Sequence, residues 1–154
     1  FDAVAKRWRG TYTDPAGAKA LLGPWADQTN VAIWGGGGTL AAIAQVLPRA
    51  QMYQARNAAP RHGTAEEPAS PRILIWAVGR SRQPNWPPPS FAPELVIDLN
   101  YSEDSPGREY ALAQKARYVS GDAWFAAQAA EQRRFFSAEQ ESEIAASASA
   151  QGVF

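Results

Sequence analysis

Four consecutive glycines at residues 35–38 constrain the fold of this chain more than any other feature. Glycine loses more conformational freedom on folding than any other residue and adds no side-chain packing, so a run of it between two regular elements needs a structural reason. The apolar residues 31–34 before the run are typical of a buried strand, and the alanine-rich residues 39–47 after it are typical of a helix. With a second strand predicted at residues 50–53, this segment has the size and order of a β–α–β unit.

The rest of the chain is predicted to alternate between helices and strands in the same way. A helix is expected at residues 16–22, with Asp14 as its N-cap and Pro15 in its first position. Further strands are predicted at 73–77, 95–99 and 118–119, and further helices at 106–117, 121–136 and 138–148. Residues 55–71 are predicted to be a loop, and the proline-rich residues 80–93 a surface segment. The alternation favours an α/β fold with a doubly wound parallel sheet, Rossmann-like, in a single domain.

The glycine run indicates a phosphate-binding turn. The dinucleotide-binding fingerprint has a glycine, any residue, a second glycine, two more residues, and then glycine or alanine. Gly35 and Gly37 satisfy the first two positions, whereas the larger Leu40 occupies the third. In such a turn the backbone amides at a helix N-terminus face the anion. The alternative interpretation is a flexible turn between strand and helix that binds no ligand.

The residues after the second predicted strand favour NADP over NAD. Domains that bind NAD place an acidic residue about 20 residues beyond the glycines, where it binds the ribose hydroxyls. Here the chain reads Gln54-Ala55-Arg56-Asn57, with Arg61 close behind and no carboxylate. Two arginines suit the 2′-phosphate of NADP, because guanidinium groups bind phosphate strongly. Ordinary solvated arginines are the alternative interpretation.

Five segments between about residue 10 and residue 136 resemble the shikimate dehydrogenase family in order and spacing. They are Tyr12-Thr13-Asp14-Pro15, Gly35-Gly36-Gly37-Gly38-Thr39, Ala55-Arg56-Asn57, Asp98-Leu99-Asn100-Tyr101, and the stretch from Gly121 to Gln128-Ala129 followed by Phe135-Phe136. The resemblance implies the NADP-binding domain of an oxidoreductase that interconverts 3-dehydroshikimate and shikimate by hydride transfer. An origin in a fused, multifunctional shikimate-pathway protein is compatible with it.

The same resemblance implies roles for individual residues. Asp14 is expected to be catalytic, by assisting proton transfer, and Gln128 and Tyr101 are expected to contact the substrate. The expected cofactor-binding residues are Gly35, Gly36, Gly37, Gly38, Thr39, Arg56, Asn57, Arg61, Ala77, Val78 and Gly121. Each substrate residue also has a plain alternative: Asp14 as a helix cap, Gln128 as a solvated helix residue, and Tyr101 as a packing residue at a strand end.

The chain departs from the family pattern at positions close to the reaction. The family's catalytic Lys lies in an N-terminal substrate domain, and neither Lys6 nor Lys19 stands in a matching context. Tyr12 and Pro15 replace the Asn and Gly of the family's Asn-Thr-Asp-Gly motif. We therefore expect residues 1–24 to form the linker and helix of the substrate-domain junction, and residues 25–154 the nucleotide-binding domain.

A chain of this kind is expected to be inactive alone, because its N-terminal substrate domain is missing. A non-catalytic Rossmann-like binding or scaffold domain without cofactor is the second hypothesis. A methyltransferase-like nucleotide site ranks last, since the acidic residue expected after its second strand is absent.

Composition argues against several other classes of protein. Lys and Arg number 15, equal to Asp and Glu, so no net charge attracts nucleic acid or an anionic membrane. The chain has no cysteine and one histidine, His62, which excludes thiol chemistry and leaves no His- or Cys-based metal site. No apolar run approaches the roughly 20 residues that span a bilayer. We therefore expect a cytoplasmic protein. Its ligand, as the resemblance to shikimate dehydrogenase implies, is a small, shikimate-like hydroxy acid.

Overall fold

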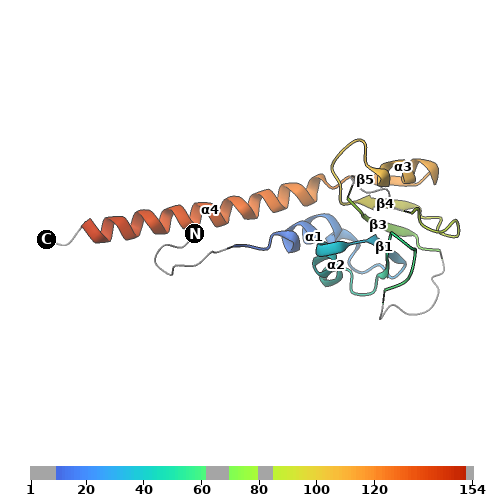
Figure 1. The fold of residues 1–154 in the computed structure, drawn as a ribbon, viewed down its shortest axis with the longest axis horizontal. Helices are drawn as coiled ribbons and strands as arrows, with labels where there is room; N and C mark the ends of the chain where they lie inside the picture. Colours follow the sequence, from blue (N-terminus) through green and yellow to red (C-terminus); the bar gives the residue numbers. More distant parts are fainter. Residues whose placement is uncertain (1–9, 62–69, 80–84, 152–154) are drawn as a thin grey trace.

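The computed structural model describes residues 10–61, 70–79 and 85–151, and side chains as far as residue 137. Its helices are α1 (Asp14–Leu22), α2 (Leu40–Val46), α3 (Pro106–Ala113) and α4 (Asp122–Gln151), with short 3₁₀ turns η1 (Gly23–Trp25) and η2 (Gly37–Thr39). Its strands are β1 (Val31–Gly35), β2 (Gln51–Tyr53), β3 (Ile73–Ala77), β4 (Leu95–Asp98) and β5 (Arg117–Val119). Figure 1 shows a compact α/β unit from which α4 extends as a long helix.

The five strands form one parallel sheet in the order β2-β1-β3-β4-β5, which confirms the predicted fold class. The predicted strands lie where the apolar runs placed them, within one residue at each end. β2 pairs with one edge of β1 and β3 with the other, so the direction in which strands are added reverses after β2. In open parallel sheets this reversal of strand order creates a crevice at the carboxyl ends of the two inner strands, where ligands bind.

Side chains of alternate strand residues fill two separate cores. Ile33, Ile75 and Ile97 face α1, α2 and the start of α4 on one side of the sheet. Trp34 and Trp76, fully buried register partners, lie on the other side, the side of α3. Figure 1 shows α3 and the α1–α2 pair on opposite sides of the sheet, so the strands are buried on both faces as their continuous apolar runs predict.

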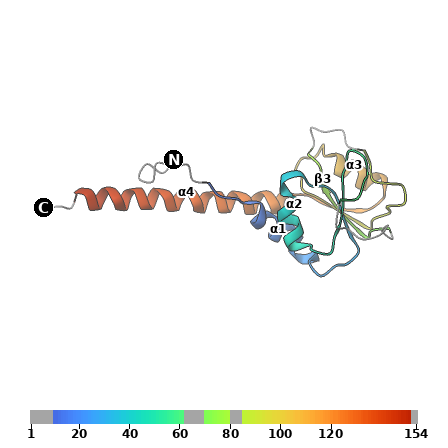
Figure 2. The ribbon, with the colours of Figure 1, turned by 60° about the horizontal axis from the view of Figure 1, so that its bottom comes forward.

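Two helix predictions were wrong in their extent. The helix predicted at residues 106–117 ends at Ala113, because Lys115 adopts a left-handed backbone (φ 55°) and the Ala116 amide donates back to Ala111. The two helices predicted at 121–136 and 138–148 are one helix, α4, seen leaving the domain in Figure 2. Residues 122–151 contain neither glycine nor proline, so nothing in them breaks a helix.

The prediction that Asp14 is the N-cap of α1 was wrong. Thr13 holds the cap position and makes no side-chain capping bond, while Asp14 belongs to the first turn. The proline-rich stretch is also less superficial than predicted, since Phe91 is buried and packs edge-on against Trp34 and Tyr53. Of this stretch, residues 80–84 lie outside the described residues, as do 62–69 of the predicted loop.

Candidate functional site

The glycine turn after β1 explains why its first three residues are glycines. Gly35, Gly36 and Gly37 have φ values of 97°, 119° and 48°, a left-handed region that side chains disfavour. Gly35 also approaches β3 so closely that a Cβ there would lie 2.8 Å from the Ala77 carbonyl oxygen. Gly38 has neither constraint, since its Cβ would meet nothing within 4 Å. Three of the four glycines are therefore required by the backbone path itself.

Some backbone amides of this turn donate hydrogen bonds within the protein, and others do not. The Gly36 amide donates to Ala77, and the Thr39 amide and hydroxyl both donate to the Gly36 carbonyl. The amides of Gly37 and Gly38 donate no hydrogen bond within the described residues. Unpaired amides in a glycine turn are suited to an anion. Leu40, the residue that breaks the fingerprint, packs over Gly36 and the core and is not among the pocket-lining residues.

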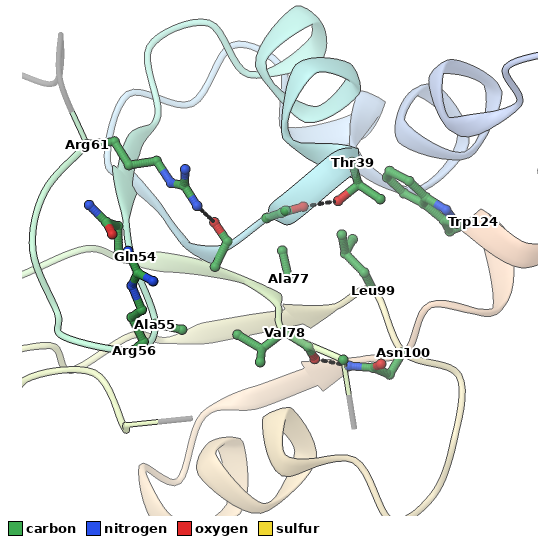
Figure 3. Close-up of a pocket in the computed structure, with 14 residues that line it drawn as sticks. Thr39, Gln54, Ala55, Arg56, Arg61, Ala77, Val78, Leu99, Asn100 and Trp124 are labelled. Atoms are coloured by element: carbon green, nitrogen blue, oxygen red, sulfur yellow. Dashed lines mark hydrogen bonds between the residues drawn. The ribbon is translucent and has the colours of Figure 1, made fainter. Parts of the chain in front are cut away.

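A pocket of about 640 Å³ opens at the carboxyl ends of β1 and β3, the predicted crevice. The residues that line it are Gly35, Gly36, Gly37, Thr39, Gln54, Ala55, Arg56, Arg61, Ala77, Val78, Gly79, Leu99, Asn100 and Trp124. They include two cationic side chains and no carboxylate. Figure 3 shows the arginines at one end of the pocket and Asn100 and Trp124 at the other, with the glycine turn between them.

Backbone contacts hold Arg61 at this end of the pocket. The Arg61 amide donates to Met52, and Pro60 forms a bridge with Tyr53, so the chain after β2 folds back along that strand. The Arg61 guanidinium then reaches the glycine turn, where its Nη2 donates to the Gly35 carbonyl at 3.3 Å. Arg56 is exposed and lines the same end. The positive charge predicted from the sequence thus lies beside the glycine turn.

Three predicted cofactor residues do not line the pocket. Gly38 is exposed beside it, and the Asn57 side chain accepts a bond from the Ala59 amide within a local turn. Gly121 is buried against the end of β4, where a Cβ would lie 2.3 Å from the Leu99 carbonyl oxygen. The structure gives Gly121 a clear packing reason to be glycine. The other eight predicted cofactor residues all line the pocket.

The two residues expected to meet substrate from distant parts of the sequence contact each other. Gln128 Nε2 on α4 donates to Asp14 Oδ1 on α1 at 2.5 Å. The two helices approach closely because Gly17 faces Trp124, whose ring would lie 2.8 Å from a Cβ at that position. Tyr101 is 60% exposed and stacks on Phe125 with ring centroids 4.6 Å apart. Asp14, Gln128 and Tyr101 do not line the pocket itself.

Asn100 and Asp98 are site residues that sequence reasoning missed. Asp98 is fully buried at the end of β4, where its carboxylate accepts bonds from Asn100, Ser105 and Tyr118. Burial raises the pKa of Asp98, and these hydrogen bonds only partly oppose the shift. Asp98 holds Asn100, which lines the pocket. The only sequence signal was the position of Asp98 at the end of a predicted strand. It was interpreted as part of the family motif, and it did not predict the hydrogen bonds to Asn100, Ser105 and Tyr118.

Asp98→Asn is expected to change how stability depends on pH. A carboxyl group with a raised pKa in the folded state contributes most stability below its ordinary pKa of 3.8, and that contribution is lost as pH rises through the folded value. The variant cannot titrate at this position, and the Ser105 and Tyr118 hydroxyls can turn to accept from the new amide. Urea unfolding from about pH 4 to pH 7 should therefore show the variant gaining stability relative to the parent as pH rises.

The control for this prediction is Asp27→Asn, which changes an exposed carboxylate. A difference between parent and Asp98→Asn that stays constant over the pH range, or that has the opposite slope, would contradict the assignment of a raised pKa to Asp98 in the folded state.

The part of the chain that the structure describes contains neither a metal-binding cluster nor a membrane-spanning helix. No three His, Cys, Asp or Glu side chains gather there in a way that could hold a metal ion. None of its helices is both long and apolar enough to cross a bilayer.

Comparison with known proteins finds a likeness among solved structures. No protein-family model and no curated relative matches the sequence. The shikimate dehydrogenase from Thermotoga maritima superposes with a TM-score of 0.58 and 18% identity, over 82% of this chain and 58% of the other. The chain shares its fold with shikimate dehydrogenase. The Aquifex aeolicus shikimate dehydrogenase is also similar, with a TM-score of 0.48 and 15% identity over 75% of this chain and 52% of that one.

The chain thus spans 52–58% of the length of the shikimate dehydrogenases that it resembles. At this identity the likeness concerns the fold alone.

Proposed function

We propose that this chain is the NADP-binding domain of a shikimate dehydrogenase-like oxidoreductase. The observation that carries the proposal is the pocket at the carboxyl ends of β1 and β3, which joins a glycine turn to two arginines. NADP would supply the hydride acceptor or donor, while the protein binds and orients it. The residues present fit such a group, because the Gly37 amide in the pocket suits a pyrophosphate and the two arginines suit a 2′-phosphate.

The order of groups along the pocket supports a dinucleotide over a single phosphate. The arginines lie at one end, the turn in the middle and Asn100 with Trp124 at the other end (Figure 3). An extended NADP has its 2′-phosphate, its pyrophosphate and its nicotinamide in the same order. A free phosphate or a mononucleotide would leave one end of the pocket without a ligand group.

For the substrate we propose a small hydroxy acid of the shikimate type, bound beside the cofactor and held in part by Asp14 and Gln128. Their contact supports this role, because two polar side chains from α1 and α4 meet at one point. We propose that Asp14 assists proton transfer and that the Lys partner belongs to a substrate domain outside this chain. Tyr101 is proposed to border the same space. An enzyme of this kind would act in aromatic amino acid biosynthesis in the cytoplasm.

Titration of the purified chain with NADP and NAD is expected to show a clear preference for NADP. A charge-assisted hydrogen bond contributes about 1.5–3 kcal/mol, so even one arginine contact to the 2′-phosphate should give a preference of roughly tenfold or more. Quenching of tryptophan fluorescence is a suitable measurement, since Trp124 lines the pocket. Absence of binding by either nucleotide would instead support a scaffold domain that has lost its cofactor, and equal binding would remove the role of the arginines.

A further inference from the structure

The side chain of Asn100 is held in one orientation by its neighbours. Its Nδ2 donates to the Val78 carbonyl oxygen at 2.9 Å and to Asp98 Oδ1 at 2.7 Å. Both amide hydrogens are therefore used. The backbone amide of Asn100 also donates to Asp98 Oδ1, at 2.9 Å, which fixes the start of the side chain.

This orientation cannot be reversed without loss. A backbone carbonyl can only accept hydrogen bonds, so turning the amide over would place the Asn100 oxygen against the oxygen of Val78. The Asn100 Oδ1 consequently faces away from Val78 and Asp98. It has no hydrogen-bond partner among the described residues, and the residue lines the pocket. Asn100, a pocket-lining residue, thus carries a fixed hydrogen-bond acceptor that the described part of the chain leaves unused.

The position of this acceptor determines which part of a ligand it meets. Asn100 lies with Leu99 and Trp124 at the end of the pocket opposite Arg56 and Arg61 (Figure 3). If the arginines take the 2′-phosphate and the turn takes the pyrophosphate, the nicotinamide reaches the Asn100 end. The nicotinamide ring carries one strong donor there, the N–H₂ of its carboxamide.

We propose that Asn100 Oδ1 accepts a hydrogen bond from the carboxamide of the nicotinamide and so selects the amide form of the dinucleotide. This inference rests on the proposed function, because it requires NADP in this pocket. A dinucleotide with a carboxylate in place of the carboxamide offers only acceptors to the Asn100 oxygen. The contact therefore discriminates against the acid form through a lost bond and through repulsion between two oxygens.

The test compares three ligands: NADP, nicotinic acid adenine dinucleotide phosphate, and 2′,5′-ADP, which lacks the nicotinamide half. The full chain is expected to bind NADP roughly tenfold or more tightly than the acid analogue. Asn100→Ala should reduce that ratio roughly tenfold while leaving affinity for 2′,5′-ADP unchanged. Gln54→Ala, which removes an amide from the arginine end of the same pocket, is the matched control and should leave the ratio unchanged.

The possible failures can be told apart. The role of Asn100 is overturned if the parent chain binds NADP and the acid analogue equally, or if Asn100→Ala leaves the ratio of the two affinities unchanged. In either case, binding of 2′,5′-ADP by the parent chain would still support the proposed function. No binding of 2′,5′-ADP by the parent chain overturns the proposed function, and this inference with it. If Asn100→Ala misfolds and loses 2′,5′-ADP binding, the test is the ratio of the parent chain's affinities for NADP and the acid analogue. A ratio near one would then overturn the role of Asn100.

Discussion

Replacing both Arg56 and Arg61 with alanine is expected to weaken NADP binding by roughly 100-fold or more, because each arginine can supply a charge-assisted bond of about 1.5–3 kcal/mol to the 2′-phosphate. Affinity for NAD, which lacks this phosphate, should change little. The preference for NADP over NAD should therefore nearly disappear. Calorimetric titration of both nucleotides into the parent chain and the double variant measures the effect directly.

A loss of both affinities together would have a different meaning. Arg61 also donates to the Gly35 carbonyl, so its removal can disturb the glycine turn. In that case NAD would lose affinity as much as NADP, and the arginines would be supporting the turn without binding the 2′-phosphate. The matched control is Arg133→Ala, which removes an exposed arginine of α4 that does not line the pocket and should leave both affinities unchanged.

Gly121→Ala is expected to destabilise the fold by about 2–3 kcal/mol, a large part of the stability of a domain of this size. The added Cβ would lie 2.3 Å from the Leu99 carbonyl oxygen, and this atom belongs to backbone that is held by the sheet. The Gly121 amide also donates to the Asn100 carbonyl, so the two segments cannot separate without losing a hydrogen bond. Urea unfolding followed by tryptophan fluorescence measures the change.

The control for this prediction comes from the glycine turn. At Gly38 a Cβ would meet nothing within 4 Å, and its φ lies outside the left-handed range, so Gly38→Ala should change the free energy of unfolding by less than about 0.5 kcal/mol. Equal stability of Gly121→Ala and the parent would show that the Gly121–Leu99 approach relaxes easily. The role of Gly121 in contacting a cofactor, which the resemblance implied, would then be open again.

The strands could be predicted well from the sequence, but the end of α3 and the continuity of α4 could not. Residues 31–34 and 73–77 are short apolar runs, and residues 95–99 are apolar except for Asp98; strands buried on both faces require this pattern locally. The end of α3 depends on the left-handed residue Lys115, a residue type with no special preference for that conformation. Sequence gives no warning of such an end, because it follows from the path the chain must take to reach β5.

The candidate site divides in the same way. The glycine turn and Arg56 and Arg61 were found because both signals are local: a residue type with unusual backbone freedom, and positive charge where an acid was expected. Asn100 was missed, because an asparagine after a strand resembles any turn residue. Its orientation comes from the Val78 carbonyl, which is 22 positions away in the sequence and directly follows the neighbouring strand β3.

The sequence by itself determined the order of the elements, the parallel α/β class and the position of the turn, since each of these depends on hydrophobic pattern and backbone freedom within a few residues. Only the tertiary structure decided which residues share the pocket, why Gly121 must be glycine, and that Asp14 and Gln128 meet. These facts depend on distances between segments that are up to 114 positions apart, and such distances are set by how helices and strands pack.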